Sequence, residues 1–130
     1  MLPNLDAVLT AAIQNKRRLR LRYKDQAAPR VVEPHVLYRT RSGRLVLQAY
    51  QTRGYSAGNR VPPFWRPFQV RKIATLDVLE EMFTPRVREG YETVYKLIRG
   101  ELLAAADPRE SDYFYFNTGP YGPPGPALRP

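Results

Sequence analysis

The segment KRRLRLRYKD, residues Lys16–Asp25, alternates charged and apolar side chains with a period of two. Three apolar residues share one side and four cations share the other: Leu19, Leu21 and Tyr23, then Arg18, Arg20, Arg22 and Lys24. This period is typical of a β-strand with one face in the core and the other toward solvent. Because like charges along one strand face repel one another, something must neutralise the cations.

The rest of the N-terminal part predicts one helix and several more strands. Residues 4–16 carry apolar side chains at helical spacing, and Asn4 is the expected N-cap. Strands are predicted at residues 18–24, 30–39, 44–52, 64–73 and 76–79. Pro67 lies inside the fourth of these, which indicates an edge strand or a bulge. A single helix followed by short strands favours a small antiparallel barrel over βαβ units.

The C-terminal part predicts a second helix and a tail. A helix is expected to begin at Thr84-Pro85 and to end at Asp107-Pro108, since a residue before proline avoids helical geometry. The segment after it is rich in proline, glycine and clustered aromatics, which predicts a tail without a core of its own. The expected organisation is a domain, a helical extension and a Pro/Gly-rich aromatic tail, over residues 1–84, 85–107 and 108–130.

The charge is unevenly distributed along the chain. The formal net charge is +9, and residues 1–75 carry 15 Lys or Arg against three acids, whereas residues 76–130 carry six against nine. A basic half on a small domain is the electrostatic signature of a polyanion-binding protein. Solubility, or a protein partner with an acidic patch, would account for the same charge.

Several classes of chemistry are excluded by composition. The chain has no cysteine and one histidine, His35, so thiol catalysis, thiolate zinc sites and histidine metal clusters cannot form. The glycines match no phosphate-binding or dinucleotide-binding motif. We therefore expect no enzyme, no metal and no cofactor. The longest uninterrupted apolar run, Leu102 to Ala106, is far too short for a membrane span, and a cytoplasmic protein without a membrane partner is expected.

Cations and aromatic rings on the predicted strands form the main functional pattern. The cations are Arg20, Arg22, Arg44, Arg66, Arg71 and Lys72, and the rings are Tyr23, Tyr38, Tyr50, Phe64 and Trp65. Single-stranded nucleic acid is bound by this combination, because cations follow the phosphates and each stacked base contributes ~1–3 kcal/mol. Each ring also has a structural interpretation: Tyr23 lies on the apolar side of its strand, and Trp65 could cover the mouth of the barrel.

Four segments in order resemble the WYL domain, a ligand-sensing module of many bacterial transcriptional regulators. They are AIQNKRRLRLRY (12–23), VVEPHVLY (31–38), GRLVLQAYQ (43–51) and WRPFQVRKI (65–73), and the resemblance covers about residues 4–84. The eponymous Trp-Tyr-Leu is here Leu45-Val46-Leu47, and the Asp-Arg of the last motif is Arg71-Lys72. The helix-turn-helix domain that usually precedes the module is not found, so a stand-alone domain is expected.

The resemblance implies an SH3-like (Sm-like) antiparallel β-barrel, flanked here by an N-terminal and a C-terminal helix. It also implies a basic groove that binds an anionic ligand, in some members single-stranded DNA or RNA. Residues carried over from the family motifs are Arg22, Tyr23, His35, Tyr50, Arg66 and Lys72. The charge pattern adds Arg20 and Arg44, whereas the role of Arg71 stays open because the family has an acid there.

The function expected from these observations is a non-catalytic regulatory module. It would bind single-stranded nucleic acid or a nucleotide-derived anion, as a component of transcription or defence regulation, and could form a homodimer. The alternative is a protein-interaction module that docks through the barrel or through the Pro-rich tail. Salt dependence separates the two, since phosphate contacts weaken steeply with salt.

Overall fold

The computed structural model describes residues 4–56, 58 and 60–110. Helix α1 (Leu5–Gln14) is followed by four strands: β1 (Arg17–Tyr23), β2 (Arg30–Arg39), β3 (Leu45–Gly54) and β4 (Phe64–Gln69). The next elements are the 3-10 turn η2 (Val70–Lys72), β5 (Ile73–Met82), α2 (Tyr91–Leu97), β6 (Glu101–Ala105) and the 3-10 turn η3 (Pro108–Glu110). The predicted mainly β fold with two helices is confirmed, although β6 and η3 follow the second helix.

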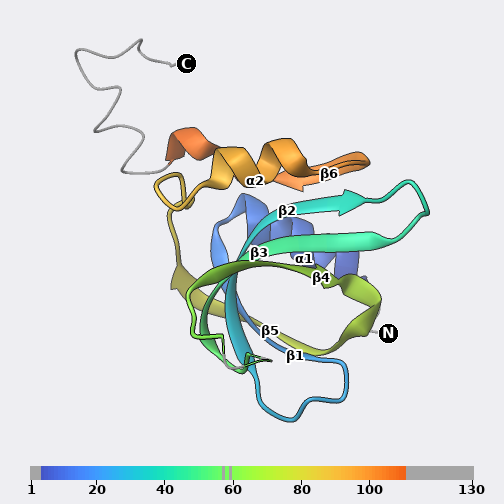
Figure 1. Cartoon of the computed structure of the whole chain (residues 1–130), viewed down its shortest axis with the longest axis vertical. Coiled ribbons are helices and arrows are strands. Elements are labelled where there is room, and N and C mark those ends of the chain that lie inside the picture. Colours follow the sequence, from blue (N-terminus) through green and yellow to red (C-terminus); the bar gives the residue numbers. More distant parts are fainter. Residues whose placement is uncertain (1–3, 57, 59, 111–130) are drawn as a thin grey trace. The chain divides into compact units, whose positions relative to one another are not determined.

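The six strands form one antiparallel sheet in the order β4-β3-β2-β1-β5, and β6 pairs with β2 outside this path. Strand β2 is central: it pairs with β3 along its length, while Arg30–Val32 pair with β1 and Val36–Arg39 pair with β6. Figure 1 shows the strands curled around a common interior. Within the described residues no pairing joins β4 to β5, so the sheet is open and the predicted closure into a barrel is not confirmed.

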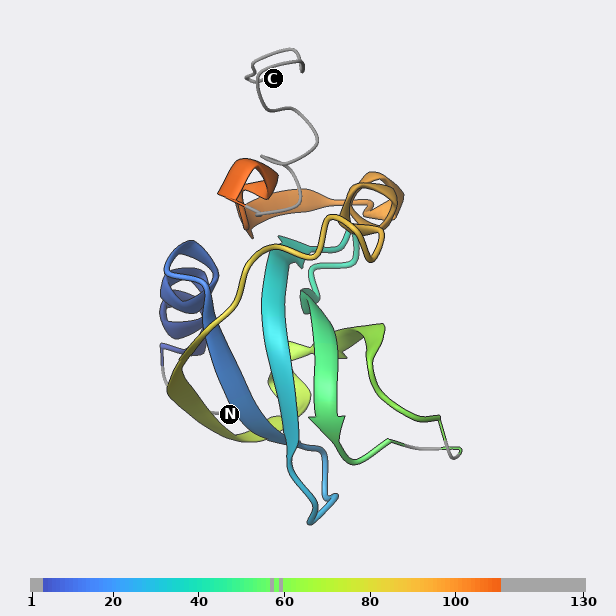
Figure 2. The same ribbon diagram turned by 90° about the vertical axis from the view of Figure 1, so that its left-hand side faces the viewer.

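The core lies between the curled sheet and α1, which contacts β1, β2 and β6 (Figure 2). Alternation places Leu19 and Leu21 inside, and both are fully buried. The other predicted core residues are buried as well: Val46, Leu47, Phe68 and Val70. Pro67 lies in β4, which is an edge strand as expected for a residue that has no N–H to donate.

Three local predictions were wrong. The helix expected over residues 84–107 is limited to Tyr91–Leu97, and residues 101–105 form β6 instead. Residues 101–105 pair with Val36–Arg39 of β2, which β1 leaves unpaired, and this pairing satisfies the backbone N–H and C=O groups of both strands. Gly100, with a φ of 134°, allows the chain to approach Arg39 closely enough for the pairing. The predicted strand 64–73 is interrupted by η2, and Asn4 has a left-handed backbone and makes no capping hydrogen bond through its side chain.

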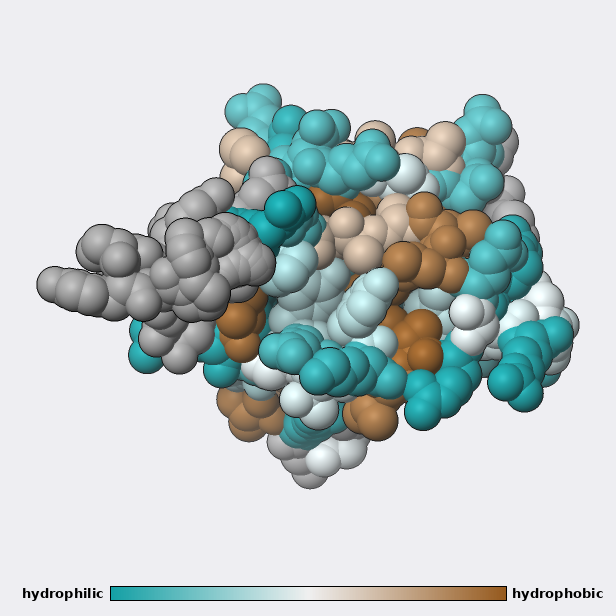
Figure 3. All heavy atoms as spheres, turned by 90° about the horizontal axis from the view of Figure 1, so that it is seen from above, coloured by the Kyte–Doolittle hydropathy of each residue, from teal (hydrophilic) through white to brown (hydrophobic). Residues whose placement is uncertain are grey.

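The chain divides into two compact units, Met1–Phe83 with Arg99–Ala106 and Thr84–Ile98 with Asp107–Pro130. The first contains α1 and all six strands, and the second contains α2 and η3. Exposed apolar side chains remain in each, Leu102 and Leu103 in the first and Leu97 in the second. Figure 3 shows apolar side chains next to charged ones at the surface. The predicted tail lies outside the described residues beyond position 110, and no described helix is long and apolar enough to span a bilayer.

Candidate anion-binding site

Two of the four ladder cations, Arg18 and Arg20, are neutralised by carboxylates of the domain itself. Arg20 forms an exposed ion pair with Asp77 on β5 at 3.1 Å. Arg18 donates to the fully buried Glu33 of β2 at 3.0 Å and lies 3.6 Å from Glu81. The ladder therefore needs no external polyanion along this part, and Arg20, a predicted ligand contact, belongs to an ordinary surface ion pair that contributes under about 1 kcal/mol.

The end of β1 leads into an aromatic cluster rather than a free stacking surface. Tyr23 is buried, and its hydroxyl accepts a hydrogen bond from the backbone N–H of Gln69 at 2.9 Å. Its ring meets that of Phe68 edge to face, with centroids 5.1 Å apart. This arrangement is favourable for aromatic pairs and holds the Tyr23 ring in place. Arg22, the residue before it, is half-buried, and no hydrogen bond or ion pair of its side chain is found among the described residues.

Two arginines approach this aromatic cluster from different strands. The guanidinium carbon of Arg66, on β4, lies 5.8 Å from the Tyr23 ring centroid and 5.4 Å from that of Phe68. The guanidinium carbon of Arg30, on β2, lies 5.6 Å and 5.5 Å from the same two centroids. Arg30 is 1% exposed, whereas Arg66 is half-buried. The pair thus brings two positive charges together at the edge of the core.

No described carboxylate compensates this pair. Arg30 donates to the side-chain oxygens of Gln26 at 2.7 Å and Gln51 at 3.3 Å, and neither arginine forms an ion pair among the described residues. The Nε atoms of both are buried without a hydrogen-bond partner there. Burial, and then the positive charge of Arg66, lower the pKa of Arg30. Buried charges in proteins are ordinarily paired, so this arrangement favours an anion.

A second cationic group lies where β1 and η2 meet. The backbone N–H of Lys24 donates to the carbonyl of Lys72 at 2.7 Å, and the Lys24 ammonium lies 5.6 Å from the Tyr23 centroid. Partial burial lowers the pKa of Lys72, and three neighbouring cations lower it further: Lys24, Arg71 and Arg44. Three cations thus lie 5.6–5.8 Å from the Tyr23 ring centroid, and Lys72 adjoins them through Lys24. We call Arg30, Arg66, Lys24 and Lys72 the Tyr23 cationic cluster.

Two predicted ring contacts lie in a separate group. His35 is fully buried, with its ring centroid 4.8 Å from that of Trp65 and 5.0 Å from that of Phe83. Its Nδ1 lies 2.9 Å from the carbonyl oxygen of Glu33, which can only accept, so Nδ1 carries the proton. Tyr50 is 7% exposed and meets the Trp65 ring at 5.1 Å. Both side chains pack in the fold.

Strand alternation explains why the predicted groove divides in this way. Trp65 and Arg66 are consecutive on β4, so their side chains point to opposite faces of the strand. Tyr50 pairs directly with Trp65 across β3 and β4, whereas Phe68 lies on the face of Arg66. Of the eight predicted residues, the structure brings Tyr23, Arg66 and Lys72 together, while His35 and Tyr50 lie with Trp65. Arg22 neighbours Tyr23 along the chain, Arg20 lies farther along the ladder, and Arg44 lies in the turn before β3.

Sequence analysis missed Arg30 and Lys24. Arg30 lies two residues before the buried Val32 on β2, so the two side chains point to the same face of the strand. This spacing indicated that the Arg30 side chain faces the interior. No signal distinguished Lys24 from the rest of the ladder. Among the described residues no group of three His, Cys, Asp or Glu side chains is arranged to hold a metal ion.

The fold and the site define a small, mainly β domain with a cationic cluster built on an aromatic core. The model of the WYL domain matches residues 4–78, and the chain belongs to this family of ligand-sensing, regulatory modules. A solved structure of proteasome accessory factor B/C (PafBC) of Arthrobacter aurescens is similar in fold, with a TM-score of 0.53 and 22% sequence identity. The match covers 83% of this chain and 16% of that one. No curated protein matches the chain.

Proposed function

We propose that this domain is a non-catalytic regulatory module that binds single-stranded nucleic acid or a nucleotide-derived anion at the Tyr23 cationic cluster. Its biological role in this proposal is the control of transcription or of a defence response. In this proposal the curled, open sheet corresponds to the SH3-like barrel of the family, and the ligand binds at its basic end. The ligand brings the negative charge, since the described part of the chain offers the cluster no carboxylate.

One observation carries this proposal: Arg30 and Arg66 lie against the same Tyr23 ring without an acidic partner among the described residues. Two guanidiniums in this position repel each other and lose hydration, so the free domain bears an electrostatic cost. A phosphate would remove this cost, because guanidinium N–H groups match phosphate oxygens in geometry and in charge. Arg66 is the half-buried member and thus the one that contacts the ligand, whereas Arg30 supports it from inside.

The remaining predicted residues take different roles in this proposal. Lys72 and Lys24 extend the positive surface around Tyr23 and contact further phosphates. Arg22 adjoins Tyr23 along β1. Tyr50 and His35 pack against Trp65 on the opposite face of β4 from Arg66, so these three rings support the strand and lie outside the site. Arg20 is excluded from the site because Asp77 already neutralises it.

The test is a fluorescence-anisotropy titration of a labelled short single-stranded oligonucleotide at several salt concentrations. We expect Arg66→Ala and Arg22→Ala to lower the affinity and to reduce the slope of log affinity against log salt by about 0.7 for each lost phosphate contact. Three matched controls should change little, because each arginine is already ion-paired: Arg20→Ala, Arg86→Ala and Arg109→Ala. Equal losses in all five variants would indicate diffuse attraction to a basic surface and would overturn the proposal.

The rival function, a protein-interaction module, predicts a different result. Docking through the Pro-rich tail would depend weakly on salt and would map to residues 113–126, which lie outside the described residues. A homodimer would appear in sedimentation as a concentration-dependent mass. Turnover of the oligonucleotide or of free nucleotides during the titration would contradict the non-catalytic part of the proposal.

A further inference from the structure

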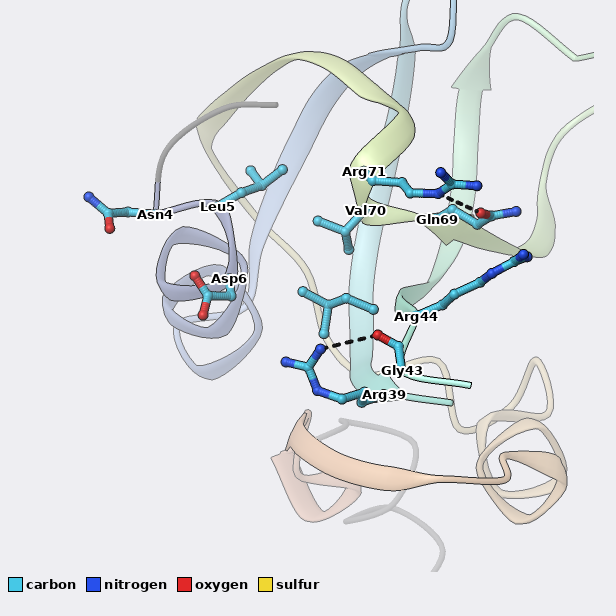
Figure 4. A pocket seen from close by; sticks show the side chains of 10 residues that line it. Asn4, Leu5, Asp6, Arg39, Gly43, Arg44, Gln69, Val70 and Arg71 are labelled. Carbon is cyan, nitrogen blue, oxygen red and sulfur yellow. Dashed lines mark hydrogen bonds between the residues drawn. The ribbon is translucent and has the colours of Figure 1, made fainter. Parts of the chain in front are cut away.

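A hollow lies beside the start of α1 (Figure 4). It adjoins the Tyr23 cationic cluster through Gln69, which donates to Tyr23, but none of the four cluster residues lines it. Its volume is about 620 Å³, and it is lined by the first turn of α1, the turn between β2 and β3, and the segment that leads into η2. Sites for small molecules commonly have about 300–1,000 Å³. The hollow is therefore large enough for a ligand of the size of a mononucleotide.

Three arginines from three different elements line this hollow. Arg39 comes from the end of β2, Arg44 from the turn before β3, and Arg71 from η2. Arg39 donates to the carbonyl of Gly43 at 3.3 Å and Arg71 to the side-chain oxygen of Gln69 at 3.4 Å. None of the three forms an ion pair with a described residue, so most of their five N–H donors remain free for a ligand.

The directions of the arginines give the hollow two ends. Figure 4 shows Arg44 and Arg71 projecting to the same side, whereas Arg39 projects toward the side of α1. Two guanidiniums that project to the same side can bind one phosphate group together. Burial is the largest cause that lowers the pKa of the neighbouring Lys72, and the charges of Lys24, Arg71 and Arg44 lower it further. Arg44 and Arg71 thus define an anion-binding end.

The remaining lining completes a site for an organic molecule rather than for a bare ion. Leu5, Leu45 and Val70 add apolar surface to the lining. Figure 4 shows Val70 between α1 and the side to which Arg44 and Arg71 project. Asp6, on the side of α1, provides a carboxylate that forms no ion pair among the described residues. It can accept a hydrogen bond from a hydroxyl or amino group of the ligand.

We propose that this hollow is a second binding site, for an organic monophosphate of mononucleotide size. Arg44 and Arg71 bind its phosphate, its apolar or flat body packs on Leu45 and Val70, and Asp6 accepts a hydrogen bond at the far end. The site adjoins the Tyr23 cationic cluster but is lined by other residues, so one domain would hold a strand-binding site and, next to it, a small-ligand site.

The test uses isothermal titration calorimetry of the full chain with three probes: adenosine 5′-monophosphate, adenosine and inorganic phosphate. We expect adenosine monophosphate to bind at least about tenfold more tightly than inorganic phosphate, and adenosine to bind weakly, because both the phosphate and the body contribute. Equal affinity for adenosine monophosphate and inorganic phosphate, or no measurable binding of the nucleotide, would overturn the proposal.

The variants separate this site from the Tyr23 cationic cluster. Arg44→Ala and Arg71→Ala should each weaken adenosine monophosphate about tenfold or more, since each removes a charged hydrogen-bond donor. The ion-paired Arg20→Ala and Arg109→Ala serve as matched surface controls and should leave it within about twofold. If Arg44→Ala and Arg71→Ala weaken only the oligonucleotide, the hollow is part of the strand-binding surface and the proposal fails. If Arg66→Ala weakens the oligonucleotide alone, both proposals stand as separate sites.

Discussion

Arg30 and Arg66 hold their guanidinium carbons 5.6 Å and 5.8 Å from the centroid of one ring, that of Tyr23. The two residues come from strands β2 and β4, which are separated in the sheet by β3. The ring face attracts each cation, yet such contacts contribute only about 0.5–2 kcal/mol each and do not replace a carboxylate. The pair of uncompensated guanidiniums therefore lowers the stability of the free domain.

Replacing Arg30 with methionine should leave the free domain as stable as before or more stable. Methionine can keep apolar contacts with Tyr23 and Phe68, and it removes a buried charge that no described carboxylate compensates. Urea unfolding measures the change, and the anisotropy titration should show weaker oligonucleotide binding by the same variant. A clear loss of stability would mean that the hydrogen bonds to Gln26 and Gln51 outweigh the charge, and Arg30 would then be structural.

Replacing Tyr50 with alanine should lower stability and not affinity. The side chain is 7% exposed and packs edge to face against Trp65, so its loss leaves a cavity that costs about 3 kcal/mol or more. Tyr50→Phe is the matched control and should cost far less, because it keeps the ring. Melting curves measure both variants. A folded Tyr50→Ala protein with normal stability and weakened oligonucleotide binding would assign Tyr50 to the ligand instead.

Replacing Lys72 with glutamine should raise the melting temperature of the free domain at neutral pH. The pKa of Lys72 is lowered in the folded state, so folding disfavours its charged form, and the charge destabilises the fold wherever the lysine is protonated. The advantage of the variant should be full near pH 7 and should disappear above about pH 10–11, where lysine is neutral in both states. Melting curves at the two pH values measure this. An equal advantage at both would rule out charge as the cause.

Replacing Gly100 with alanine should destabilise the pairing of β6 with β2. An added Cβ would collide with the carbonyl oxygen of Arg39, and the φ of 134° is strained for any other residue, at a cost of about 1–3 kcal/mol. Gly43→Ala is the control, since its φ of 88° is also positive but no atom lies near the added carbon. Urea unfolding should show the larger loss for Gly100→Ala. Equal losses would mean that the backbone conformation alone, and not the approach to Arg39, sets the cost.

Much of the fold was readable from the sequence because each strand encodes its own inner and outer face. Leu19 and Leu21 are buried because they alternate with charged residues, and Pro67 indicated an edge strand because it has no N–H to donate. The excess of positive charge in the first 75 residues was also evident. These are local properties, set by neighbours along the chain, and they led to the correct family.

Only the tertiary structure decided which cations are free. Asp77 and Glu33 reach the β1 ladder through the pairing of β5 and β2 with that strand, and nothing within the ladder segment specifies those partners. Arg30 and Arg66 meet because the sheet curls, which brings side chains of non-neighbouring strands to one ring. The strand conformation of residues 101–105 is likewise decided by tertiary structure. The part of β2 that β1 leaves unpaired, Val36–Arg39, forms backbone hydrogen bonds with these residues, and this pairing outweighs their helical sequence pattern. Cross-strand register and curvature are properties of the whole sheet, so the charge balance at any one residue emerges only when the sheet has formed.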